Sequence, residues 1–159
     1  GITQIFERIS KIYHDAEHNK RICGAIFDRV SAVEVTIRSL KFRWEEHKES
    51  FTQKNYTVLQ KILHNIQKLE NFVNDVTQSK GIKYIQVESI ESMFYDLTKE
   101  FDRYIDELDL VILVDVERRR RDKQILKKDF EDLNKYLESM HISKQNTSSC
   151  VVLANKLSR

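Results

Sequence analysis

Apolar residues recur at intervals of three and four along most of the chain, which is the period of an α-helix with one buried face. The clearest run lies in residues 21–44. Its members are Ile22, Ile26, Val30, Val33, Ile37, Leu40 and Trp44. Further apolar positions widen this surface beyond one stripe, namely Cys23, Ala25, Phe27, Ala32 and Val35. A helix that is apolar on more than one side needs several neighbours. We therefore expect residues 21–44 to form the central helix of a bundle.

A shorter stripe precedes this helix and consists of Ile2, Ile5, Ile9, Ile12 and Ala16. It predicts a first helix that ends within residues 17–20, where Asn19 can stop or cap it. Almost no linker separates the two helices, so we expect an antiparallel hairpin. The polar residues 45–55 then predict a loop, in which Ser50 and Thr52 are candidate caps for the next helix.

Two more helical stripes follow the loop. The first consists of Leu59, Ile62, Ile66, Leu69, Val73 and Val76. It stops at residues 78–81, where Gly81 suits a left-handed C-terminal position. The second consists of Val87, Ile90, Phe94, Leu97, Phe101, Tyr104, Leu108 and Val111. We expect its aromatic residues to fill the widest part of the core.

The apolar pattern stops in residues 117–124 and then resumes with Leu126, Phe130, Leu133, Leu137 and Met140. This predicts a break within residues 109–117, followed by a fifth, amphipathic helix. Its narrow apolar face suits a position across the outside of a bundle. The pattern is lost from His141 onward, which predicts a flexible or weakly packed tail. The predicted fold is all-α, with an up-down four-helix bundle in residues 1–114, an outer amphipathic helix in 115–141 and a tail in 142–159.

Composition agrees with this fold and narrows the environment. The 159 residues suit one domain, and they include no proline, three glycines and one-third charged residues, which favours long helices. The net charge of +2, with mixed signs, does not indicate nucleic acid. Cys23 and Cys150 form no disulfide framework, so we expect a reducing cytoplasmic compartment. The longest apolar run, residues 108–116, contains two aspartates and is too short to span a membrane.

No residue pattern predicts catalysis, a metal site or a cofactor site. His14 and His18 are four residues apart, but no further ligand stands at matching spacing, so surface histidines are the preferred interpretation. The carboxylate pairs at 45–46 and 106–107 lie among lysines and arginines, which is typical of solvated helix faces rather than of acid–base catalysis. Phosphate-binding glycine loops and nucleophile motifs are missing from the sequence. We therefore predict a protein that is not an enzyme.

Residues 118–128 contain seven basic residues and one acidic residue. The run begins with four arginines: Arg118, Arg119, Arg120 and Arg121. If a helix starts near Asp115, these cations crowd its first turns, where the helix dipole disfavours them. One interpretation is a solvated helix start whose arginines pair with bundle carboxylates. The other is a binding site for an anionic surface, with phosphoinositide headgroups ahead of nucleic acid. The aromatic residues lie in the core stripes rather than in this run, which argues against base stacking.

A smaller basic set lies around the first hairpin and consists of Arg8, Lys11, Lys20 and Arg21. Glu7, Asp15 and Glu17 lie among these residues and dilute their charge. A solvated helix face is therefore the preferred interpretation of this set, and a lipid-binding surface is the alternative.

Three segments together resemble a known family. They are HNKRICGAIFDRVSAVEVTIRSL (18–40), FYDLTKEFDRYIDEL (94–108) and ERRRRDKQILKKDFEDLNKYLESM (117–140). They are similar to the N-terminal domain of the mixed lineage kinase domain-like family, which executes necroptosis, and to the wider HeLo class of fungi and plants. The last segment looks like the brace helix of that family, with an arginine-rich start followed by spaced leucines. The likeness covers roughly residues 1–141 and lies in the helix pattern rather than in a motif.

The resemblance implies a bundle that permeabilises membranes. A brace and a downstream kinase or pseudokinase would hold it in check, and it would oligomerise when released. By position, Arg8, Lys11, Lys20 and Arg21 would bind phosphoinositides, while Leu126, Phe130, Leu133 and Leu137 would hold the brace. The expected location is the cytoplasm, with recruitment to the plasma membrane. A regulatory or oligomerisation module of a kinase without membrane activity is the second hypothesis, and a free-standing helical adaptor is the third.

Overall fold

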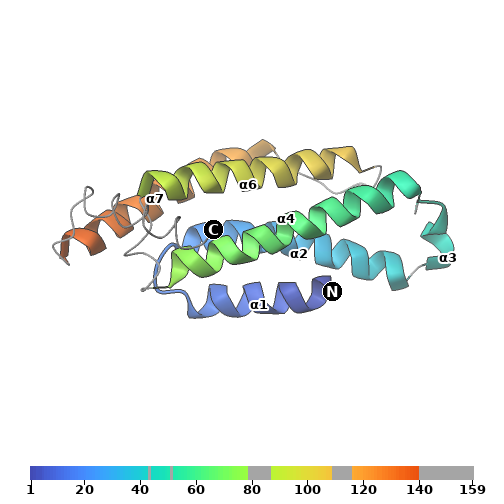
Figure 1. Ribbon diagram of the computed structural model, residues 1–159, viewed down its shortest axis with the longest axis horizontal. Coiled ribbons are helices and arrows are strands. Elements are labelled where there is room, and N and C mark those ends of the chain that lie inside the picture. The colour runs from blue at the N-terminus through green and yellow to red at the C-terminus, as the bar shows by residue number, and fades with distance from the viewer. Residues whose placement is uncertain (43, 51, 79–86, 109–115, 140–159) are drawn as a thin grey trace, which may run out of the picture.

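The computed structural model describes residues 1–42, 44–50, 52–78, 87–108 and 116–139, and every regular element within these ranges is a helix (Figure 1). The all-α prediction is therefore confirmed. The elements are α1 (Ile2–Asp15), α2 (Lys20–Phe42), α3 (Trp44–His47), the 3-10 turn η1 (Lys48–Ser50), α4 (Gln53–Thr77), α6 (Val87–Glu107) and α7 (Val116–Ser139). Within the described ranges, no helix is long and apolar enough to cross a membrane.

The long helices pack side by side around α2 and α4. Helix α1 lies against α2 and α4, and α6 lies against α4. Helix α7 packs mainly along α2 and also touches α6 (Figure 1). In Figure 1, α1 lies on one side of the α2 and α4 pair, and α6 and α7 lie on the other.

A single apolar core runs through these contacts, and every long helix contributes to it. Its most deeply buried members include Ile9, Ile26, Ile66, Phe94 and Phe101, which are at most 1% exposed. These residues belong to the stripes predicted from the sequence. The expectation for Val35 is wrong, because its side chain is 50% exposed. The polar contacts between α7 and α2 involve residues 21–29 of α2, so Val35 lies beyond them along that helix.

Two polar residues close the turns between helices in the positions predicted for caps. Asn19 adopts a left-handed backbone conformation (φ 54°) between α1 and α2. Its side-chain Nδ2 donates a hydrogen bond of 2.8 Å to the carbonyl oxygen of Val76, which joins this turn to the end of α4. Thr52 caps α4, because its Oγ1 accepts a hydrogen bond of 3.1 Å from the backbone N–H of Asn55.

The predicted loop at residues 45–55 is partly wrong, since α3 and η1 occupy most of it and α4 begins at Gln53. The segment contains several glutamates and lysines, which favour helix, and Glu45 pairs with Lys48 at 3.3 Å. Gly81 and the predicted tail at 142–159 lie outside the described residues. The same holds for most of the predicted break, although α6 ends at Glu107 and α7 begins at Val116, on either side of it.

Candidate functional site

The contact face of α7 repeats every seven residues and combines apolar with polar side chains. Leu126 and Leu133 are 2% exposed and Leu137 is 4% exposed, and all three join the core, while Phe130 packs partly against it. A second line on the same face consists of Asp122, Asp129 and Tyr136. Both aspartates are buried. The outer helix therefore carries carboxylates inside its contact with the rest of the molecule.

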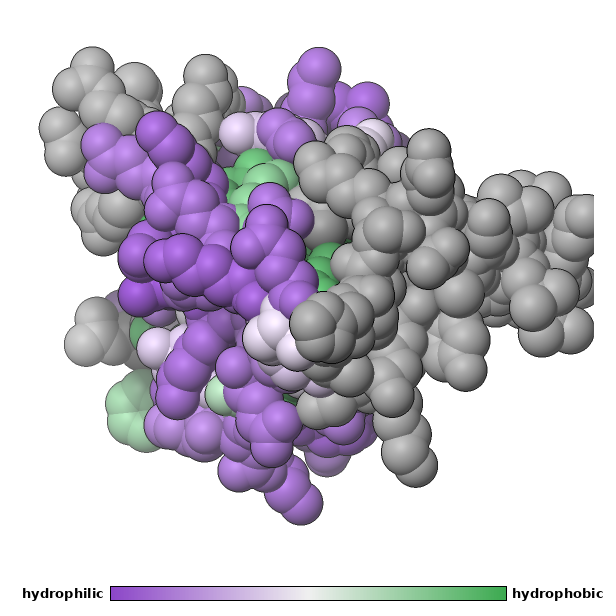
Figure 2. Space-filling view, turned by 90° about the vertical axis from the view of Figure 1, so that its left-hand side faces the viewer, coloured by the Kyte–Doolittle hydropathy of each residue, from purple (hydrophilic) through white to green (hydrophobic). Residues whose placement is uncertain are grey.

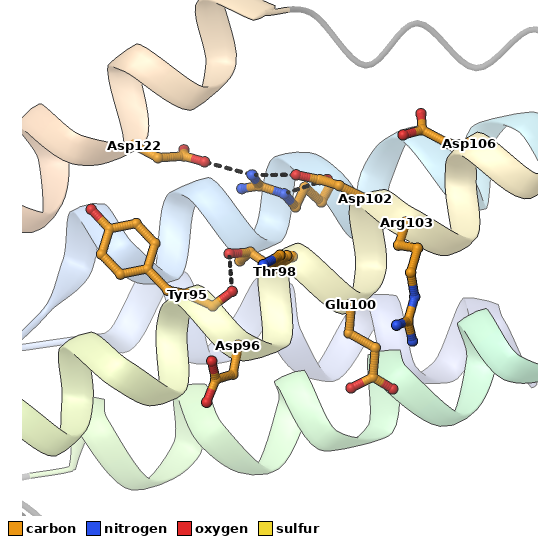
Figure 3. A pocket seen from close by; sticks show the side chains of 10 residues that line it. Tyr95, Asp96, Thr98, Glu100, Asp102, Arg103, Asp106 and Asp122 are labelled. Carbon is orange, nitrogen blue, oxygen red and sulfur yellow. Dashed lines mark hydrogen bonds and ion pairs between the residues drawn. The ribbon is translucent and has the colours of Figure 1, made fainter.

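The first carboxylate belongs to a buried charge network that joins three helices. Arg29 of α2 is 1% exposed, and its Nε donates to Asp102 Oδ1 of α6 at 3.2 Å. Its Nη2 donates to Asp122 Oδ2 of α7 and to Asp102 Oδ2 at 3.4 Å. Figure 3 shows the dashed lines from Asp122 and Asp102 meeting at this guanidinium. Because a buried charge without a partner is costly, each of the three side chains depends on the others.

The pKa of Arg29 reflects the same balance. Burial works to lower its pKa, but the hydrogen bonds and charges of Asp122 and Asp102 outweigh burial and raise the pKa above the ordinary value. Arg29 therefore stays charged inside the protein, and it requires carboxylates beside it.

The second carboxylate, Asp129, lies at the first turn of α2. Its Oδ2 accepts a hydrogen bond of 2.6 Å from the backbone N–H of Ile22, and its Oδ1 lies 3.3 Å from Arg21 Nη1. The N–H groups of a first helical turn have no partner within the helix, and they favour a negative charge. Arg21 Nη1 also donates to Asp132 Oδ2 at 2.8 Å. Helix α7 thus supplies the cap for the start of α2.

The pKa values of Asp129 and of the neighbouring Asp132 are shifted in opposite directions. Burial raises the pKa of Asp129, although the Ile22 N–H and Arg21 act in the opposite direction. The hydrogen bond from Arg21 lowers the pKa of the exposed Asp132. Burial, together with the nearby charge of Asp129, raises the pKa of the Cys23 thiol to about 12, so that thiol stays protonated.

An aromatic contact extends the attachment of α7 by two further turns. The rings of His18 and Tyr136 lie 4.2 Å apart between centroids. Asp122, Asp129 and Tyr136 therefore each touch α2 or the turn before it, at intervals of seven residues. His14 lies beside the ring of Tyr13 instead. Within the described part of the chain, no group of three or more His, Cys, Asp or Glu side chains could hold a metal ion.

The structure places the basic residues of the first hairpin in different settings. Arg8 Nε lies 3.1 Å from Glu70 Oε1 of α4, and Arg21 pairs with the two aspartates of α7. Lys20 Nζ lies 5.5 Å from the centre of the Tyr13 ring, and Lys11 is exposed on α1. Figure 2 views the end of the molecule where α1 meets α2, and the described residues there form a mainly hydrophilic surface. Arg8 and Arg21 therefore have part of their charge balanced by carboxylates.

The four arginines predicted as a second basic site lie in the first turns of α7, which starts at Val116. Their side chains lie outside the description. Nearby, a cavity of about 840 Å³ adjoins the Arg29 network. Figure 3 shows acidic side chains around it, among them Asp96, Glu100 and Asp106. Two of the carboxylates that line the cavity, Asp102 and Asp122, form ion pairs with Arg29.

Sequence reasoning missed the Arg29 network and the role of Asp129, although the pattern contained a signal. Arg29 lies three residues after Ile26 and four before Val33, inside the apolar run of the central helix. Asp122 and Asp129 alternate with Leu126 and Leu133 at spacings of four and three. Opposite charges inside apolar stripes indicate partners across a helix contact.

No protein-family model matches the chain, and no curated protein or solved structure matches it either.

Proposed function

We propose that this chain is a cell-death effector domain of the HeLo kind. Helices α1, α2, α4 and α6 would form its up-down four-helix bundle, and α7 would be its brace. Release of the brace allows the bundle to bind anionic membrane lipid, to self-associate and to permeabilise the membrane. The observation that carries the proposal is the attachment of α7 through buried charges, Asp122 to Arg29 and Asp129 to the first turn of α2.

A contact made through buried charges suits a helix that is released from the bundle during activation. A buried ion pair adds little net stability while it is intact, because desolvation of the two charges offsets much of their attraction, and its hydrogen bonds form in one arrangement only. A modest input that shifts α7 would therefore break several contacts together. In the proposed protein, a downstream kinase or pseudokinase domain supplies that input.

Departure of α7 would also change the charge of the corner between α1 and α2. Arg21 now faces Asp129 and Asp132, and both carboxylates would leave with the brace. Arg21 and Lys20 would then stand together without these two acidic neighbours. Each Lys or Arg close to an anionic surface adds roughly 1 kcal/mol to binding, so the released corner would favour phosphoinositide headgroups. Recruitment from the cytoplasm to the plasma membrane would follow from this change.

A second function class fits a different observation. In the state described here, Arg8 pairs with Glu70 and Arg21 pairs with α7, which reduces the positive surface available to lipid. A helical regulatory or oligomerisation module of a kinase, without membrane activity, would need no such surface. The two hypotheses differ in a direct test on vesicles.

The test measures vesicle flotation and dye release with phosphoinositide-containing and neutral liposomes. We expect the double variant Asp122→Asn and Asp132→Asn, which removes one carboxylate of Arg29 and the exposed partner of Arg21, to bind anionic vesicles more strongly than the wild type and to release more dye. Added salt should weaken this binding. Introducing Lys20→Glu and Arg21→Glu into the loosened variant should abolish it. Lys54→Glu with Lys61→Glu, at exposed positions in the N-terminal half of α4, reverses the same number of charges and serves as the control.

The outcome separates the two hypotheses. The loosened variant can stay folded and yet neither bind anionic vesicles nor release their dye at low salt. In that case the membrane hypothesis fails, and the kinase-associated regulatory module becomes the better explanation. Circular dichroism checks that all variants keep their helicity.

A further inference from the structure

The first turn of α2 takes a side-chain cap from another helix. The carbonyl oxygen of Asn19 accepts a hydrogen bond of 3.0 Å from the backbone N–H of Cys23, so Asn19 occupies the N-cap position of α2. The side-chain oxygen of an N-cap residue ordinarily accepts a hydrogen bond from the second or third helical residue, and the third is Ile22. The Ile22 N–H instead donates to Asp129 Oδ2 of α7 at 2.6 Å. Helix α7 therefore holds the donor that the cap residue of α2 would ordinarily bind.

The side chain of Asn19 binds a different partner. Its Nδ2 donates to the carbonyl oxygen of Val76 at 2.8 Å, at the C-terminal end of α4, which lies beside the turn between α1 and α2 (Figure 1). Its Oδ1 is buried and has no hydrogen-bond partner among the described residues. The backbone of Asn19 is left-handed (φ 54°), which is unfavourable for residues other than glycine, whereas an N-cap residue that binds its own helix has an extended backbone. Asn19 therefore adopts a conformation of higher energy, in which it binds α4 rather than its own helix.

The Ile22 N–H thus has two candidate acceptors. While α7 is in place, Asp129 binds this N–H and Asn19 remains on α4. Without Asp129 the N–H lacks a partner, and a change of Asn19 to an extended backbone brings its unpaired Oδ1 to the start of α2. The change gains a cap and leaves the left-handed region, and it costs the hydrogen bond to the Val76 carbonyl. The gains outweigh that cost only after α7 has left.

We propose that Asn19 replaces Asp129 as the cap of α2 when α7 is released, and that this exchange detaches the turn between α1 and α2 from the end of α4. The inference rests on the release of α7 in the proposed function, and it adds a route from that helix to the bundle. The detached turn leads directly into Lys20 and Arg21, the corner that would face anionic lipid. Departure of α7 then frees the backbone of this corner as well as its charge.

The exchange of caps is tested on the full chain in solution, without lipid, by rates of amide hydrogen exchange measured by NMR. Asp129→Ala removes the acceptor on α7, whereas asparagine at this position would keep an acceptor oxygen. Because Asn19 supplies the new acceptor, the Ile22 N–H should remain protected in this variant. Adding Asn19→Gly, which suits the left-handed backbone but has no side-chain acceptor, should then accelerate exchange at Ile22 by about fivefold or more. Asn19→Gly alone should change this rate by less than about twofold, because Asp129 still binds the donor.

A second signal reports whether Asn19 leaves α4. The side-chain Nδ2 hydrogens of Asn19 should exchange about fivefold faster in Asp129→Ala than in the wild type, because their bond to Val76 is broken. Asp132→Ala is the matched control, since it removes an exposed carboxylate one turn further along α7 and leaves the Ile22 cap in place. Both the Ile22 N–H and the Asn19 side chain should exchange in this control as in the wild type.

Two results overturn the proposal. Asp129→Ala could lose protection at Ile22 to the same extent with and without Asn19→Gly, or the Asn19 side chain could keep its wild-type exchange rate in Asp129→Ala. A further pair of variants keeps Asp129 and covers the case in which Asp129→Ala does not fold. Asn19→Ser provides an uncharged cap oxygen that competes for Ile22, so it should accelerate exchange along α7 about threefold or more relative to Asn19→Gly. Equal rates in these two variants also contradict the exchange of caps.

These measurements are independent of the vesicle assay. Exchange of the cap without vesicle binding by the loosened variant contradicts only the membrane function. Vesicle binding by that variant, together with no exchange of the cap in Asp129→Ala, contradicts only the present inference.

Discussion

Phe101 and Asp102 are neighbours on α6, and both are buried, yet they belong to two different kinds of contact. Phe101 is 1% exposed and lies within the apolar core. Asp102 is 6% exposed and holds Arg29 together with Asp122 of α7. The core gains stability from apolar area removed from water, which is largely independent of direction. The contact of α7 adds charged groups that are favourable only in one arrangement.

This difference separates stability from attachment. A core of interlocking apolar side chains loses stability in proportion to the atoms removed and the cavity left. A buried ion network contributes little net stability while intact, but breaking it leaves an uncompensated charge. We therefore expect core substitutions to lower the stability of the whole domain, and substitutions in the network to act mainly on α7.

The largest expected effect is in the core. Phe101→Ala should lower the free energy of unfolding by about 3–5 kcal/mol, because it removes a fully buried ring and leaves a cavity. Urea titration followed by circular dichroism measures the change. Met93→Ala, at an exposed position on the same helix, should cost far less. A loss below about 1 kcal/mol for Phe101→Ala would show that this face of α6 contributes little to the core.

A smaller and more local effect is expected for the network. Asp122→Asn removes one of the two carboxylates of Arg29, at a cost of about 1–3 kcal/mol, because a buried charge loses part of its compensation. In this variant, the rate of amide hydrogen exchange should increase much more along α7 than along α4. Asp96→Asn, which changes an exposed carboxylate beside the same cavity, is the control. Uniform acceleration in α4 and α7 would mean that α7 unfolds only with the rest of the domain.

The contrast between the two regions also explains what the sequence could predict. Helical periodicity located all five long helices, because each core stripe is a simple repetition of apolar residues such as Ile22, Ile26 and Val30. The same reasoning assigned no contact to Asp122 and Asp129, since it follows apolar residues and charged residues are usually exposed. Their burial depends on Arg29 and on the first turn of α2, which are about 90–110 residues away in the chain. Pairing over such separations is not encoded in local periodicity, so it became visible only in the structure.

The smallest expected effect is the pH dependence of the α7 contact, where two neighbouring aspartates act in opposite directions. The pKa of Asp129 is raised in the folded protein, so its contribution to stability is fully present below its unfolded pKa and is lost as the pH rises through the folded value. The pKa of Asp132 is lowered, so its contribution is present above its unfolded pKa and is lost as the pH falls through the folded value. Stability should therefore gain from Asp129 as the pH falls from neutral toward about 4, and lose from Asp132 below that.

The variants Asp129→Asn and Asp132→Asn separate these two contributions. Asp129→Asn should remove the gain between neutral pH and about pH 4 while retaining the loss at lower pH, and Asp132→Asn should do the reverse. Unfolding free energies measured by urea titration across this range, taken as differences from the wild type, cancel the contributions of distant groups such as Asp75, whose pKa burial also raises. If both variants change the pH dependence in the same direction, the two carboxylates share one environment. The charged contact of α7 would then lack the division between a buried helix cap and an exposed ion pair that the structure shows.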